Sequence, residues 1–94
     1  MTFYDFMQKT YKKAIRETDG AGYEDEPDTL LACDMSKDTS FPRNVTNDHG
    51  KWHGIIRQHL VAHGGDVACL IAFEHCWSMY LRALADQQRG RTML

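Results

Sequence analysis

The chain has 94 residues and a formal net charge of −2 at pH 7, so it suits one small domain and gives no global reason to expect a nucleic-acid partner. Hydrophobic residues make up 43% of it and ten residues are aromatic, which excludes a disordered chain. Three cysteines at spacings that fit no disulfide framework predict reduced thiols. The longest apolar run, Val67 to Phe73, is far shorter than the ~20 residues of a membrane helix. We therefore expect a soluble cytoplasmic protein that does not span a membrane.

A first helix is predicted from about Phe3 to Glu17, with Thr2 as its N-cap and Asp5 in its first turn. Aromatic and aliphatic residues share one side of this helix and predict a core face. Cations at i, i+3, i+4 and i+7 share the other side, and we call them the basic stripe: Lys9, Lys12, Lys13 and Arg16. A solvated helix face explains such a stripe, and partner binding is the functional alternative.

The segment from Thr18 to Glu26 contains two glycines and four acids, which predicts an exposed loop. Its spacing fits neither a calcium-binding loop nor a phosphate-binding loop. Three consecutive residues at its end are the second candidate for partner binding, and we call them the acidic loop: Glu24, Asp25 and Glu26.

Pro27 suits the first turn of a second helix, predicted to run to about Ser36 and to bury Leu30, Leu31 and Met35. The following Phe41-Pro42 pair disfavours helix and predicts a turn in which Phe41 enters the core.

A third helix is predicted after a cap at Thr46, Asn47 or Asp48, ending at Gly64-Gly65. One arc of this helix carries both apolar residues and histidines: His49, Trp52, Ile55, Ile56, His59, Leu60 and His63.

Asp66 is the expected N-cap of the last helix, whose apolar arc is Leu70, Phe73, Trp77, Tyr80, Leu81 and Leu84. Residues 87–94 lack such a pattern and are predicted to be a mobile tail after a single domain of residues 1–86. The expected architecture is all-α, a compact bundle of four helices, or five if a short turn is counted.

The histidines and cysteines raise the question of a metal site or an enzyme. His49 and His53 are four residues apart, as are His59 and His63, so each pair could face one metal ion. The spacing lacks the glutamate of a zinc-protease helix, and His59 at the middle of the apolar arc favours a packed, hydrogen-bonded ring. Cys69 and Cys76 favour core packing, and His75 points about 100° away from Cys76 on a helix. We expect no cofactor, no metal and no catalysis, with the role of the four histidines left open.

Three aromatic blocks resemble a known family: Phe3-Tyr4-Asp5-Phe6-Met7, Ser40-Phe41-Pro42-Arg43-Asn44 and Phe73-Glu74-His75-Cys76-Trp77-Ser78-Met79-Tyr80. With the glycine turn after His63, they are similar to the YozE-like family of small bacterial proteins, from about Thr2 to Leu84. The resemblance implies a fold like the sterile alpha motif and carries over no catalytic residue, because the matching positions are core positions. The chain departs from the family pattern in the loop from Thr18 to Glu26, in the histidine-rich third helix and in the tail.

These features favour a non-catalytic protein-interaction module, either monomeric or weakly self-associating, with an unidentified protein partner. Nucleic-acid binding through the basic stripe is the alternative. A variant of the first hypothesis is a mobile-element or phage-borne inhibitor of a host protein, in which the acidic loop mimics phosphates.

Overall fold

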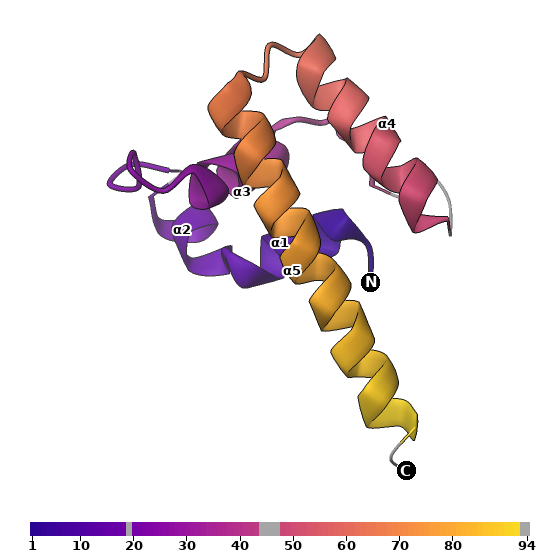
Figure 1. Cartoon of the computed structure of the whole chain (residues 1–94). Coiled ribbons are helices and arrows are strands. Elements are labelled where there is room, and N and C mark those ends of the chain that lie inside the picture. The colour runs from indigo at the N-terminus through magenta and orange to yellow at the C-terminus, as the bar shows by residue number, and fades with distance from the viewer. Residues whose placement is uncertain (19, 44–47, 93–94) are drawn as a thin grey trace.

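A computed structural model describes residues 1–18, 20–43 and 48–92, with side chains described as far as residue 90. Within these ranges the chain forms five α-helices and no strand (Figure 1). They are α1 (Phe3–Thr10), α2 (Lys12–Glu17), α3 (Pro27–Lys37), α4 (His49–Ala62) and α5 (Val67–Thr92). The predicted all-α bundle is confirmed.

Helices α1 and α2 occupy the stretch in which the sequence predicts one helix. The Thr2 hydroxyl accepts from the backbone N–H of Asp5 and caps α1, as predicted. The break lies at Tyr11, whose backbone has φ −109° and ψ 25°. Helical hydrogen bonding persists across it, since Tyr11 donates to the carbonyl of Met7 and Ile15 donates to the carbonyl of Tyr11. Tyr11 is therefore a kink that redirects the chain toward α3, and no glycine or proline marks it.

Helix α3 begins at Pro27, as the missing N–H of proline allows in a first helical turn. It buries Leu31 and Met35 as predicted, together with Ala32 and Cys33, whereas Leu30 is half-buried. Phe41 lies in the core with 4% of its surface exposed, which confirms the predicted turn.

Helix α4 is capped by Asp48, whose Oδ1 accepts from the N–H groups of Gly50 and Lys51. The other two cap candidates, Thr46 and Asn47, lie outside the described residues. The helix ends at the predicted glycines: Gly64 has φ +82°, and Gly65 donates to the carbonyl of Leu60 over 2.8 Å.

Helix α5 starts after Asp66, whose Oδ1 accepts from the Cys69 N–H over 2.8 Å, and it runs to Thr92. The sequence predicts a tail from residue 87, but residues 87–92 are helical. Glutamine, arginine and alanine favour helix without an apolar pattern, and Arg89 pairs with Asp86 over 3.1 Å. In Figure 1 this end of α5 extends beyond the other helices. Its mobility stays a prediction.

The core is built around Phe3, which is fully buried. Its ring meets those of Phe73, Trp77 and Tyr80 with centroids 5.3–5.6 Å apart. The Tyr80 hydroxyl donates to the carbonyl of Met1 over 2.7 Å, so the first residue of the chain is hydrogen-bonded to α5. The aromatic blocks of the sequence therefore meet as one cluster.

The helices contribute unequally to the bundle. α3 and α5 form its most extensive contact, and α1 contacts α2, α3 and α5. α4 packs against α5 alone among the five helices and inserts Trp52 and Ile56 into the core. Figure 1 shows α4 lying apart from α1 and α2. No helix in the described ranges is long and apolar enough to cross a membrane.

Candidate functional site

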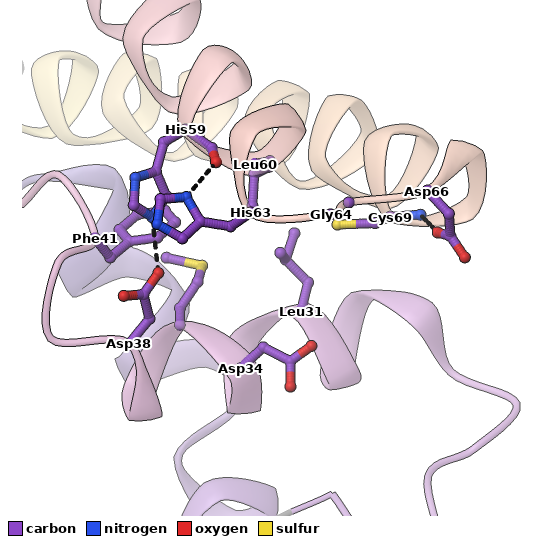
Figure 2. Close-up of a pocket in the computed structure, with 12 residues that line it drawn as sticks. Leu31, Asp34, Asp38, Phe41, His59, Leu60, His63, Gly64, Asp66 and Cys69 are labelled. Atoms are coloured by element: carbon purple, nitrogen blue, oxygen red, sulfur yellow. Dashed lines mark hydrogen bonds and ion pairs between the residues drawn. The ribbon is translucent and has the colours of Figure 1, made fainter.

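A cleft of about 380 Å³ opens between the end of α3, the turn that joins α4 to α5, and the first turn of α5 (Figure 2). Its apolar part is formed by Leu31 and Met35 from α3 and by Leu60 from α4. Asp38, His59 and His63 gather at one end of the cleft, and Asp66 lies at the other (Figure 2).

The imidazole of His59 binds the residue that follows α3. Its Nε2–H donates to Asp38 Oδ2 over 2.7 Å, and the His59 side chain is only 11% exposed. The ring also meets Phe41 edge to face at 5.4 Å between centroids. These contacts confirm the predicted packed, hydrogen-bonded histidine. Hydrogen bonds from the Ser40 side chain and from His59 lower the pKa of Asp38 to about 2.

His63 lies on top of His59. The ring centroids are 4.0 Å apart, and His63 Nδ1–H donates to the backbone carbonyl of His59 over 2.8 Å. The His63 side chain is exposed at the mouth of the cleft. The predicted i, i+4 pair of His59 and His63 therefore faces one cleft. A carboxylate fixes the His59 ring, and a backbone carbonyl fixes the His63 ring.

Three acidic or thiol side chains line the rest of the cleft. Asp66 caps α5 through the Cys69 N–H, and Asp34 is exposed on α3. Burial, with added repulsion from Asp66 and Asp34, raises the pKa of the Cys69 thiol. A thiol held protonated is a poor nucleophile, so the His59–Asp38 pair has no activated group beside it. The described residues contain no group of three or more side chains able to hold a metal ion.

Polar side chains approach the core at Cys76, whose predicted core packing is confirmed by its full burial. Tyr11 and Asp28 lie close enough to the Cys76 thiol to affect its pKa. Asp28 Oδ2 also accepts from His75 Nδ1–H over 2.5 Å. Cys76 is fully buried, and burial together with the Asp28 charge raises its pKa to about 12. Asp28 thus lies near both His75 and Cys76, and sequence spacing gave no signal for this acid.

The basic stripe remains together despite the kink at Tyr11. All four of its cations are exposed, and with Thr10 and Glu17 they line one hollow of about 620 Å³ on α1 and α2. The hollow is polar and carries a single acid, so its surface is predominantly positive.

The acidic loop is also exposed at all three positions. Glu24 turns back on its own segment, where Oε1 accepts from the Gly22 N–H over 3.1 Å. Backbone hydrogen bonds, from its own N–H and then from that of Gly22, lower the pKa of Glu24. The loop directly follows α2 in Figure 1, and none of its three acids lines the hollow of the basic stripe.

Sequence reasoning missed an exposed apolar surface on α4 and α5. Two hollows adjoin there because Arg57 lines both of them. Val61, Val67 and Ile71 line these hollows and are 51%, 73% and 65% exposed. Periodicity places apolar residues on helices but does not show which of them another helix leaves uncovered. We call Val61, Val67 and Ile71, with Ile55 and Leu70 beside them, the α4–α5 surface.

Comparison with known proteins identifies the family of the chain but no individual curated protein or solved structure that matches it. The family model described as the YozE SAM-like fold matches residues 2–82, which include all three aromatic blocks and the cleft. The chain belongs to the YozE SAM-like fold family.

Proposed function

We propose that this protein is a non-catalytic protein-interaction module that binds its partner through the α4–α5 surface. The observation that carries the proposal is the exposure of Val61, Val67 and Ile71 around hollows joined by Arg57. Single exposed apolar residues are ordinary, but several around adjoining hollows with a charged rim are typical of a partner-binding face. Glu74 and Lys51 supply further charge at that rim.

The protonated state of the thiols supports the proposal that the protein is not a catalyst. The pKa values of Cys69 and Cys76 are both raised, so neither thiol is poised to attack a substrate at neutral pH. Reduced thiols also suit the cytoplasm, which is the compartment we propose.

The test compares the wild-type protein with a Val67→Ser/Ile71→Ser variant in affinity capture from a nuclease-treated lysate of the organism that carries the gene. The control is Leu81→Ser, which changes an apolar residue of α5 that is 42% exposed and lies outside both hollows. We expect the double variant to lose a protein that the wild type and the control retain. Equal capture by all three proteins, or no captured protein together with a strict monomer by light scattering, contradicts the proposal.

Nucleic-acid binding is the second candidate, because the four cations of the basic stripe line one hollow. Each phosphate contact contributes affinity that falls with salt concentration. A Lys12→Glu/Lys13→Glu variant should therefore bind DNA or RNA more weakly and with a flatter salt dependence. Unchanged binding excludes the basic stripe as the nucleic-acid-binding surface. Captured material that disappears when the lysate is treated with nuclease favours nucleic-acid binding.

A further inference from the structure

The polar side chains of the cleft in Figure 2 present acceptors and almost no donors. His59 uses its Nε2–H on Asp38, and His63 uses its Nδ1–H on a carbonyl. In the neutral rings, His59 Nδ1 and His63 Nε2 therefore carry lone pairs. The other polar side chains of the lining are three carboxylates and the Cys69 thiol, which is a weak donor. A ligand that fits this lining supplies donors and needs few acceptors.

The charge of the cleft also favours a ligand that supplies hydrogen-bond donors. Asp38 is engaged by Ser40 and His59, and Asp66 caps α5, which leaves the exposed carboxylate of Asp34 as the most available charge. Helices α3 and α4 both end here, and helix C-termini carry partial negative charge. The positive end of α5 also lies here, but its Asp66 cap offsets it. The cleft therefore favours a cation.

The cleft also has an apolar part and a limited size. Leu31, Met35 and Leu60 line it between the polar ends, so a hydrocarbon chain can lie against them. Its volume of about 380 Å³ is near the lower end of the roughly 300–1,000 Å³ typical of ligand pockets. These dimensions suit one long side chain with a charged head.

We propose that the cleft binds the side chain of an arginine carried by a partner protein. The guanidinium has five donors and no acceptor, which complements Asp34 and the lone pair of His63. Its planar face can lie against the exposed His63 ring, whereas an ammonium cannot stack in this way. The inference rests on the proposed interaction function and adds a second point of contact, formed by residues that do not line the apolar hollows.

The test is an NMR titration at pH 7.5 with N-acetyl-arginine methylamide, compared with its lysine and norleucine analogues and with inorganic phosphate. We expect the arginine compound to shift the amide resonances of Asp34, His63 and Cys69. Asp34→Asn should weaken this binding about five- to tenfold, since it replaces a charge-assisted hydrogen bond by a neutral one. Asp86→Asn, the same change at an exposed site on α5, should leave it unchanged.

Four results overturn the inference: no shift at the cleft, equal binding of the norleucine analogue, binding of the lysine analogue as tight as that of arginine, or shifts at the same amides with phosphate. Undiminished binding by Asp34→Asn overturns it as well, and a melting curve shows that this variant is folded. None of these experiments uses the partner protein or the α4–α5 surface. Failure of the arginine site is therefore distinguishable from failure of the Val67→Ser/Ile71→Ser test.

Discussion

The side chain of Tyr11, at the kink between α1 and α2, lies beside the buried thiol of Cys76 in the middle of α5. Asp28 also lies near this thiol and accepts a hydrogen bond from the exposed ring of His75. Burial, followed by interaction with Cys76 and Asp28, raises the pKa of Tyr11, so its hydroxyl stays protonated across the physiological range. Side chains from α2's start, α3 and α5 therefore meet around Cys76.

Removing the Tyr11 hydroxyl should therefore destabilise the fold. We expect Tyr11→Phe to lower the free energy of unfolding by about 1 kcal/mol, because the hydroxyl loses its polar contact with Cys76 while the ring remains packed. Urea denaturation measures the change. Tyr23→Phe, at a half-buried tyrosine of the loop, is the control and should have little effect. An equal loss in both variants would show that the Cys76 contact contributes nothing.

The three thiols should differ in reactivity according to burial. Cys33 and Cys76 are 1% and 0% exposed, whereas Cys69 is only half-buried at the cleft. We expect Cys69 to react first with a maleimide at pH 7.5, and the other two only when the protein unfolds. Mass spectrometry of the labelled peptides measures the order. Early labelling of Cys76 would contradict the full burial of this thiol in the core.

Acid should weaken the link between Asp38 and His59. The folded-state pKa of Asp38 is lowered from 3.8 to about 2, so its carboxylate stabilises the fold above pH 3.8 and this stability is lost as the pH falls toward 2. We expect the loss to be roughly 1 kcal/mol, since the side chain is partly in water. Asp38→Asn should remove this part of the decline. Wild type and variant should then differ at pH 5 and converge near pH 2, as followed by thermal unfolding.

Glycine substitutions should separate backbone strain from helix propensity. Gly64→Ala places a side chain at φ +82° and should cost about 1–2 kcal/mol. Gly54→Ala lies inside α4, where an added Cβ meets nothing within 4 Å, and should stabilise by about 0.5–1 kcal/mol. The two variants should move the melting temperature in opposite directions. A fall in both would mean that Gly54 has a packing role that the structure does not show.

Most of the helices could be predicted from the sequence because their ends carry local signals. The caps at Thr2, Asp48 and Asp66 and the glycines after His63 act within a few residues, and the structure confirms each. The kink at Tyr11 has no such signal, since helical hydrogen bonds continue on both sides of it. The aromatic blocks indicated the core because large rings meet wherever helices cross.

The candidate sites were harder to predict because their parts are distant in the chain. Asp38 and His59 are 21 residues apart, and Asp28 and His75 are 47 apart. Neither pair follows from helical spacing, which relates only residues on one helix. The basic stripe and the His59–His63 pair were visible as local patterns, and the residues of each do share one hollow or cleft.

The one-sided packing of α4 has a consequence for the cooperativity of the domain. Because the backbone of α4 lies close to that of α5 alone among the helices, we expect α4 to detach more readily than the others and to expose Trp52 and Ile56 while the contacts among α1, α2, α3 and α5 stay formed. Such an opening must break the bond from His59 to Asp38 and the bond from His53 to Glu74. The domain is then expected to unfold as two units of unequal size. We expect the amide hydrogens of α4 to exchange through a partial unfolding that those of α3 do not share, and a ligand bound in the cleft to slow that exchange.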